Sequence, residues 1–474
     1  MKVLKSYIVR LLMALTVLSG YTSCYNDDRL EGGAENVPAA QYINITVGVS
    51  TSDNRVTRSP LGGEYGDGAE MGSDAENMVR NITLIFYEDV PNGINTTSED
   101  AAVACVKTYI VTPVSNYEPE NHEHKAGEDD NVKTNEVLYT TGDQRLDETS
   151  LVAGSTYRVL VAANVDLNVK VGDKISTVRD QVYSNALYTI ENGVATDFVM
   201  TSESDATVSL TNPTQKTTGE NRFVYYFNCI HMERLAARID YDTNTTGVTY
   251  DETLGGYKYP VGSDGGFFVV TKVTPFNLYN ESEYVFKRVR NNWTDASPVI
   301  SRLGNESTTN YVVDPNTADK DGSHTFTYLS PIAQNMDNGY TKSMSSDQNK
   351  NKSNIVITYA RENTLKPASP LKKYATGLAF EIKYYVTPTA EPVTRVYYHY
   401  LRHQGEKPTG SYQAYLWSAL SDETTCGTTP MNYGIVRNNI YRVKIEGFTP
   451  LEGVLKVTIE EKHWRHVDNP TIYI

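Results

Sequence analysis

Short segments in which apolar and polar residues alternate recur along almost the whole chain, and they constrain its fold more than any other feature. Residues 81–87 and 440–445 are typical. Successive side chains of a β-strand point to opposite faces, so this alternation predicts strands with one buried face. The chain also has 35 tyrosines, many beside valine or isoleucine, and such residues favour strands. Helical periodicity is confined to short pieces around residues 174–188 and 283–290. We therefore expect an all-β fold of sandwiches.

The length of 474 residues allows two or three domains. Residues 211–221 form the clearest polar linker, so we expect a domain boundary there, with one β-sandwich over 59–215 and a second over 216–474. The segments expected to form strands are residues 42–49, 81–87, 103–111, 157–163, 207–210, 234–241, 266–273, 355–359, 378–386, 393–401, 440–445 and 454–459.

The first 23 residues have the pattern of a secretory signal peptide. Basic residues precede an apolar stretch over residues 9–18, which is too short to span a bilayer. The leader ends in small residues before Cys24, which resembles a bacterial lipobox, in which this cysteine becomes lipidated. The acidic pair Asp27-Asp28 resembles an export signal of surface lipoproteins. The alternative is an ordinary secretory signal that is cut nearby, with Cys24 incidental.

Composition excludes several classes of function. The formal charge is −15 and there is no basic cluster, which argues against nucleic acid as a partner. Beyond Cys24, the widely spaced Cys105, Cys229 and Cys426 make neither a disulfide framework nor a metal knuckle. One bridge could form, but the sequence selects no pair.

Three motifs suggest ligand chemistry, and each has a simpler explanation. The glycines of residues 63–72 have the wrong spacing and acidic neighbours for a dinucleotide site. His122-Glu123-His124 offers two metal-binding nitrogens but has no obvious third ligand. The oxygen-rich residues Asp314, Asn316, Asp319 and Asp321 lack the order of an EF-hand loop, which favours a turn. We expect no metal, no cofactor and no enzyme activity, since no nucleophile and base are suitably spaced.

Two segments far apart in the chain look like alternatives for one position in a sheet. In residues 42–49, the side chains of Ile43, Ile45, Val47 and Val49 fall on one face. The end of the chain offers the same alternation, and its apolar positions are Leu455, Val457, Ile459, Trp464, Ile472 and Ile474. Which part of this last segment would act as the replacement is left open by the sequence.

Two arginines, Arg55 and Arg58, follow the first of these segments in a stretch rich in Gly and Asp. A cut there would release the first strand, and the last strand of another chain could fill the vacancy by strand addition. The alternative is that both segments are ordinary strands of a stable monomeric lipoprotein.

Several blocks, in this order, resemble the Bacteroidales fimbrillins, the type V pilins of the FimA-like and Mfa-like families. The blocks are residues 81–87, 157–164, 198–202, 232–239, 311–315, 361–365, 398–403 and 433–443, followed by Trp464 and residues 472–474. Together they cover nearly the whole chain.

The resemblance implies two tandem transthyretin-like β-sandwich domains behind a lipoprotein signal peptide. It implies a precursor anchored in the outer membrane by its lipid and cut by an Arg-specific surface protease after Arg58 or Arg55, which removes a propeptide over 24–58. It further implies head-to-tail polymerisation with other pilin subunits into surface fimbriae that adhere to host or bacterial ligands. A shaft subunit is the preferred interpretation. A tip or anchor subunit and a glycan-binding surface lipoprotein are the alternatives.

Overall fold

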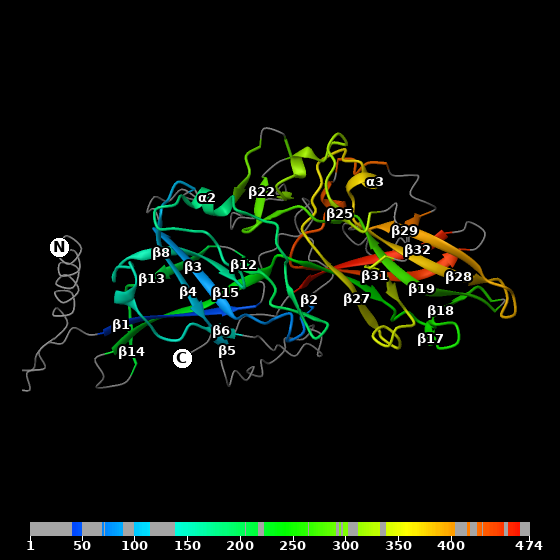
Figure 1. The fold of residues 1–474 in the computed structure, drawn as a ribbon, viewed down its shortest axis with the longest axis horizontal. Helices are drawn as coiled ribbons and strands as arrows, with labels where there is room; N and C mark the ends of the chain where they lie inside the picture. Colours follow the sequence, from blue (N-terminus) through cyan, green and yellow to red (C-terminus); the bar gives the residue numbers. More distant parts are fainter. Residues whose placement is uncertain are drawn as a thin grey trace, which may run out of the picture. The chain divides into compact units, whose positions relative to one another are not determined.

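The computed structural model (Figure 1) describes residues 40–49, 69–70, 72–88, 99–113, 138–203, 205–216, 222–263, 265–290, 293–294, 297–301, 311–331, 338–402, 415–417, 424–428, 430–449 and 454–464. Several predicted features lie outside these residues, namely the signal peptide over 1–23, Cys24, Arg55, Arg58, His122-Glu123-His124, Ile472 and Ile474. Among the described residues, no helix has the length and apolar character that crossing a bilayer requires.

Strands dominate the described part of the chain, which confirms the all-β prediction. The only α-helices found there are α2 (Ile175–Arg179) and α3 (Leu371–Tyr374). The first falls inside the helical piece expected near residues 174–188. The helix expected over 283–290 is wrong, because this segment contains two short strands, β21 (Glu283–Tyr284) and β22 (Arg288–Arg290).

The first sheet has eleven strands in the described residues, and a single long strand, β15, connects its two portions. One end of β15 pairs with β1 and the other end pairs with β12. The strands of this sheet are β1 (Ala40–Gly48), β3 (Asn81–Glu88), β4 (Val103–Ile110), β5 (Thr112–Pro113), β6 (Leu138–Thr140), β7 (Gln144–Arg145), β8 (Thr156–Ala163), β12 (Met200–Ser202), β13 (Ala206–Ser209), β14 (Thr214–Gln215) and β15 (Arg222–Arg234).

Two six-stranded sheets follow, counted over the described residues. The second sheet contains β2 (Ala69–Glu70), β16 (Ala237–Asp242), β27 (Asn354–Ala360), β30 (Tyr415–Trp417), β31 (Asn439–Thr449) and β32 (Val454–Trp464). The third sheet contains β17 (Thr249–Asp251), β18 (Gly256–Val261), β19 (Gly266–Phe276), β26 (Lys342–Ser343), β28 (Gly377–Tyr385) and β29 (Val393–Tyr400).

Short strands and single turns of 3₁₀-helix complete the fold. The remaining strands are β9 (Val182–Tyr183), β10 (Thr189–Glu191), β11 (Val194–Thr196), β20 (Leu278–Tyr279), β23 (Ile300–Ser301), β24 (Tyr311–Val313) and β25 (Tyr328–Leu329). The 3₁₀ turns are η1 (Leu146–Glu148), η2 (Thr317–Asp319) and η3 (Pro430–Tyr433).

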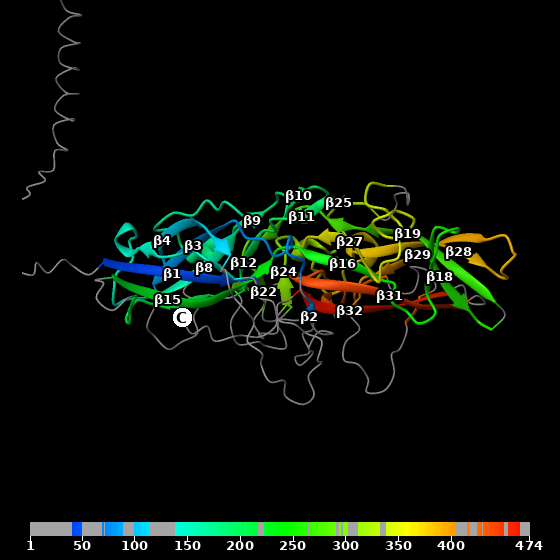
Figure 2. The ribbon, with the colours of Figure 1, turned by 90° about the horizontal axis from the view of Figure 1, so that it is seen from below.

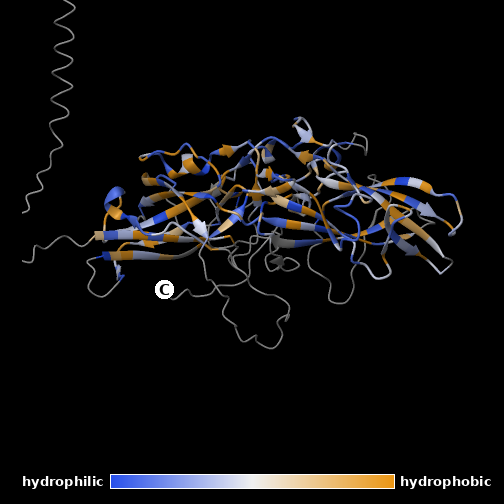
Figure 3. Cartoon of the chain, turned by 60° about the horizontal axis from the view of Figure 1, so that its bottom comes forward, coloured by the Kyte–Doolittle hydropathy of each residue, from blue (hydrophilic) through white to orange (hydrophobic). Residues whose placement is uncertain are grey.

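The largest hydrophobic clusters correspond to these sheets. The first cluster is built mainly by the eleven-stranded sheet, and the second lies between the second and third sheets, so these two sheets form a sandwich. Bands of hydrophobic and hydrophilic residues alternate along the strands (Figure 3), as expected for strands with one buried face.

After β15, the change from the first cluster to the second falls between Ala236 and Ala237, although Val285, Phe286 and Ile440 also belong to the first cluster. The polar segment over 211–221 contains β14, which pairs with β15, and β15 in turn pairs with β1. The strand β15 and the residues after it up to Ala236 therefore belong with the first cluster. The expected domain boundary at 215/216 stays a prediction.

Candidate functional site

The first strand, β1, occupies a slot between strands that are distant from it in sequence. On one side it runs parallel to β15, where Ala40 is opposite Arg222 and Ile45 is opposite Phe227. On the other side it runs antiparallel to β6 and β7. Both ribbon views show β1 alongside β15 (Figures 1 and 2). We call this position, bounded by β15 on one side and by β6 and β7 on the other, the β1 slot.

The inner face of β1 is fully buried, as the alternation predicted. Ile43, Ile45, Val47 and Val49 are 3%, 1%, 0% and 3% exposed and belong to the first hydrophobic cluster. Burying four such side chains stabilises the occupied slot by roughly 6 to 12 kcal/mol as an upper figure. An empty slot would expose this surface together with unpaired backbone groups.

The backbone of Ile45 points toward β6 and β7 rather than toward β15. Its N–H donates to the Thr141 Oγ1 at 3.1 Å, and its carbonyl oxygen accepts from the Thr141 N–H at 3.0 Å. The acceptor of the Ile45 N–H is thus a side-chain hydroxyl and not a backbone carbonyl. It belongs to Thr141, which directly follows β6.

A cluster of polar side chains contacts the outer face of β1. We call this cluster the slot clamp, and it consists of Thr140, Asp143, Lys216 and Arg222. The Asn44 Nδ2 donates to the Asp143 Oδ1 at 2.9 Å, and the Asn44 Oδ1 accepts from the Thr140 Oγ1 at 2.8 Å. Both functions of this one amide are satisfied, which fixes its position along the slot.

Charge holds the clamp together. The Arg222 Nη2 lies 2.7 Å and the Lys216 Nζ 2.5 Å from the Asp143 Oδ2. Burial raises the pKa of Asp143, but hydrogen bonds from Lys216 and Asn44 and the charges of Lys216 and Arg222 outweigh it, so the pKa lies below its usual value. Arg222 also lies over the Tyr42 ring, 4.3 Å from its centroid.

Sequence analysis missed all four clamp residues. The only sequence signal is the turn-forming run Thr140-Thr141-Gly142-Asp143, which marks a turn but not its partner. Asn44 lies on the face opposite the four apolar side chains, but its hydrogen-bond partners Thr140 and Asp143 lie 96 and 99 residues further along the chain. Only the tertiary fold brings them together.

The last described strand, β32, is part of the second core. It pairs with β31 along its whole length, from Thr449↔Val454 to Asn439↔His463. Leu455 is 0% exposed, Val457 is 4% exposed, and Ile459 packs against the same cluster. These three predicted donor residues therefore lie inside the sandwich of their own chain.

The end of β32 pairs with β2, which is the segment that follows the two arginines. Ala69 is opposite His463 and Glu70 is opposite Trp464, in parallel orientation. The chain after β2 is then fixed by a reciprocal turn, in which Ser73 N–H donates to the Glu76 Oε2 at 2.7 Å. The Glu76 carboxylate is held by Arg238 at 3.2 Å and by the Tyr359 hydroxyl at 2.7 Å.

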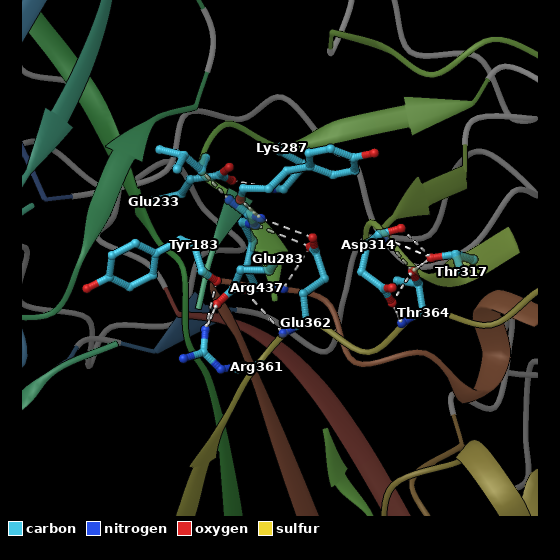
Figure 4. A network of polar contacts seen from close by, with 12 residues as sticks. Tyr183, Glu233, Glu283, Lys287, Asp314, Thr317, Arg361, Glu362, Thr364 and Arg437 are labelled. Carbon is cyan, nitrogen blue, oxygen red and sulfur yellow. Dashed lines mark hydrogen bonds and ion pairs between the residues drawn. The ribbon is translucent and has the colours of Figure 1, made fainter. Parts of the chain in front are cut away.

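Fully buried ion pairs form a second polar region (Figure 4). Arg437 pairs with Glu362 at 3.1 Å, Arg361 pairs with Glu283 at 3.0 Å, and Lys287 pairs with Glu233.

Arg361 also donates to the carbonyl oxygens of Tyr183 and Ser184, which joins segments from both halves of the chain. Burial raises the pKa of Glu283 to about 7, although Arg437 and Arg361 oppose the shift. Because Glu283 is 0% exposed on its side chain, it has no access to a substrate, and we assign it a structural role.

The oxygen-rich segment after β24 is a turn, as the sequence favoured. The Asp314 Oδ2 accepts from the Lys320 Nζ at 2.6 Å and from the Thr364 N–H at 2.8 Å. Its carboxylate is therefore neutralised by a cation of the protein itself. Over the described residues, no group of three or more His, Cys, Asp or Glu side chains could hold a metal ion. Cys105 and Cys426 are both buried and unbridged.

Comparisons with known proteins were made with this geometry in hand. No family model and no curated protein matches the chain significantly. Several solved structures match it over most of its length. A FimA fimbrilin from Porphyromonas gingivalis W83 is 13% identical, over 91% of this chain and 99% of that chain, with a TM-score of 0.39. A putative cell adhesion protein from Parabacteroides distasonis has the same identity and coverage and a TM-score of 0.38.

The tip fimbrial protein Mfa3 from P. gingivalis is 10% identical over 89% of this chain and 100% of that chain, with a TM-score of 0.37. The solved structures that the chain is similar to thus include fimbrillins, the family that the sequence blocks resemble.

Proposed function

We propose that this chain is a structural subunit of a surface fimbria and that it polymerises by exchanging its first strand for a strand of the next subunit. Of the positions in a fimbria, we propose the shaft. The precursor would be exported as a lipoprotein through Cys24 and cut after Arg58 or Arg55. Other copies of the subunit, an Arg-specific protease and the outer membrane are its proposed partners. Adhesion to host or bacterial surfaces would follow from the assembled fimbria.

The observation that carries the proposal is the way β1 is attached. It contributes four buried apolar side chains to the first cluster, yet neither flank of the slot is its neighbour in sequence. Its connection onward leads through the segment with Arg55 and Arg58. One cut there would sever the covalent link between β1 and the rest of the fold, and none of the described strands contains the cut.

Once β1 has left after the cut, the β1 slot is empty and can bind another strand. Exposed apolar surface and an unpaired strand edge favour addition of an extended segment with matching alternation. If that segment comes from another copy, the contact is head to tail and does not close on itself, so it generates a filament. The uncut β1 would suppress assembly by filling the slot.

The donor is proposed to follow β32 rather than to include it. Withdrawing Leu455 and Val457 would open the second core, because both are buried in it. The ten residues after Trp464 contain Ile472 and Ile474 and end the sequence. They lie outside the described residues and are the remaining apolar candidates for the donor.

The test is a double substitution, Arg55→Ala with Arg58→Ala, in cells that supply an Arg-specific surface protease. We expect the variant to remain monomeric and lipid-anchored, whereas the unchanged protein is recovered with an amino terminus at Ser59 or Val56. Intact mass and non-boiled gels report both states. Filaments of normal length from the double variant would refute the proposal.

A tail deletion provides the matched experiment at the other end. Removing residues 471–474 should leave a folded, cleavable monomer that forms no polymer ladder. The glycan-binding alternative gains no support from the tyrosine-rich segments, since Tyr225, Tyr397 and Tyr400 are buried in the cores. Such side chains cannot stack on a sugar.

A further inference from the structure

The last six residues of the chain repeat the pattern of the second half of β1. Residues 44–49 are Asn-Ile-Thr-Val-Gly-Val, and residues 469–474 are Asn-Pro-Thr-Ile-Tyr-Ile. Asparagine and threonine recur at the first and third positions, and a β-branched apolar residue recurs at the fourth and sixth. Residue 469 then corresponds to residue 44 and residue 474 to residue 49, and this alignment defines a register for the last six residues in the β1 slot.

The recurring asparagine is the residue that the slot clamp recognises. In the uncut chain, Asn44 donates to Asp143 and accepts from Thr140. Both partners belong to the part of the chain that stays after a cut at Arg55 or Arg58. Asn469 in the place of Asn44 would satisfy the same donor and the same acceptor.

The apolar positions agree with this register. Ile472 and Ile474 would take the places of Val47 and Val49, which are 0% and 3% exposed in the first cluster. One residue before the match, Asp468 would correspond to Ile43, whose site is apolar and 3% exposed. A carboxylate is unfavourable there. The match therefore begins at Asn469, and the donor occupies the second half of the slot.

Proline in a strand is tolerated only where its missing N–H is not needed by the sheet. In this register Pro470 takes the place of Ile45, whose N–H points away from β15 and donates to the Thr141 side chain. The ladder with β15 therefore keeps all its bonds. A shift by one residue would place Pro470 at a position whose N–H faces β15.

We propose that residues 469–474 of a second copy enter the β1 slot parallel to β15, with Asn469 held by Asp143 and Thr140 of the acceptor. The inference rests on the proposed function. It adds the register of the donor strand and the acceptor residues that determine this register. Asp143 and Thr140 are specificity determinants in this proposal. Asp143 accepts from the amide nitrogen and disfavours a second carboxylate, and Thr140 donates to the amide oxygen.

Cysteine pairs test the register. Gly48 is opposite Leu138 and Val47 is opposite Ile230 in the occupied slot, and none of these residues belongs to the slot clamp. Filaments that carry Leu138→Cys with Tyr473→Cys, or Ile230→Cys with Ile472→Cys, should therefore form disulfides between subunits, because facing strand positions lie within bonding range. Leu138→Cys with Thr471→Cys and Ile230→Cys with Ile474→Cys are the two-residue slip controls and should cross-link at least about tenfold less.

The outcomes separate the two proposals. Normal filaments that cross-link best in a slip control, or not at all, would overturn the register and leave the fimbrial function standing. Cleaved wild-type protein that forms no filament would refute the function itself. Because the two cysteine pairs lie on opposite sides of the slot, a donor in reversed orientation cannot produce both cross-links.

A charge exchange tests the clamp. Asn469→Asp would set a carboxylate against Asp143 and should slow assembly by about tenfold or more, since a charged hydrogen bond is replaced by repulsion. Asp143→Asn in the same chain should restore most of the rate. Asn44→Asp is the contrasting variant, because the same repulsion should loosen β1 in the precursor, whereas the residue leaves with the propeptide and the cleaved subunits should assemble at the wild-type rate. Failure of Asp143→Asn to rescue would overturn the clamp's role.

Discussion

The strands β1 and β32 look alike in sequence but differ in how they are held. β1 buries Ile43, Ile45 and Val47 along one face, whereas β32 buries Leu455 and Val457 and packs the partly buried Ile459 against its core. The neighbours of β1 are β15, β6 and β7, all far away in the chain, whereas β32 forms a hairpin with β31, the strand just before it. Alternation thus indicates that a strand is buried, but its sequence neighbours determine whether it can be exchanged.

The comparison also separates the two kinds of polar contact. The slot clamp lies at the surface, where Arg222 and Lys216 are 36% and 43% exposed on their side chains. The ion pairs around Arg437 and Glu362 are completely buried. Removing one member of a buried pair is far more damaging than loosening an exposed contact. The polar contacts of β1 are of the more exposed kind, although Asp143 itself is only 6% exposed on its side chain.

The largest effect is expected from a charge in β32. Leu455→Asp should prevent the second sandwich from folding in the precursor and the mature chain alike, because an unpaired carboxylate would be buried at a site with 0% exposure. Circular dichroism and urea unfolding of both forms measure this. Lys456→Ala, at the half-buried next residue, is the control and should stay within about 0.5 kcal/mol. Folded Leu455→Asp protein would contradict the core role of β32.

A smaller and form-specific effect is expected in β1. Ile45→Ala should lower the free energy of unfolding of the precursor by about 2 to 5 kcal/mol through a cavity in the first cluster. Polymers assembled after cleavage should keep wild-type stability, since the substituted strand has left. Urea unfolding before and after protease treatment gives the two values. An equal loss in the polymer would mean that β1 is retained.

The smallest effect is a pH dependence of the clamp. The pKa of Asp143 is lowered in the folded precursor, so its contacts stabilise the fold above the unfolded value near 3.8 and are lost as the pH falls through the lower folded value. The stability difference between wild type and Asp143→Asn should shrink between pH 5 and pH 3. Thermal melts across this range measure it. A difference that is independent of pH would remove the electrostatic part of the clamp.

Strand positions were largely predictable because they depend on local alternation. The predicted segments 81–87 and 393–401 correspond to β3 and β29 within one residue at either end. The helical periodicity of segment 283–290 did not predict its structure. The side chains of Glu283 and Lys287 are buried in ion pairs with residues distant in the sequence, which local sequence cannot reveal.

The site was predictable only in part. The buried face of β1 followed from the alternation of four apolar residues. The parallel partner β15 and the clamp residue Asp143 did not, because parallel pairing and side-chain contacts across about a hundred residues leave no local pattern. The arginines, Cys24 and the tail lie outside the described residues and stay predictions.

The parallel pairing of β1 with β15 also has a consequence for the order of folding. Ala40 is among the first residues synthesised, yet its partner Arg222 appears only after nearly half of the chain. Contacts of such long range form late, since the entropy of closing the intervening loop must be overcome first. We therefore expect β1 to dock onto a sheet that is already largely assembled. The step by which a neighbour's strand would later enter the slot is the same step that completes the folding of each precursor.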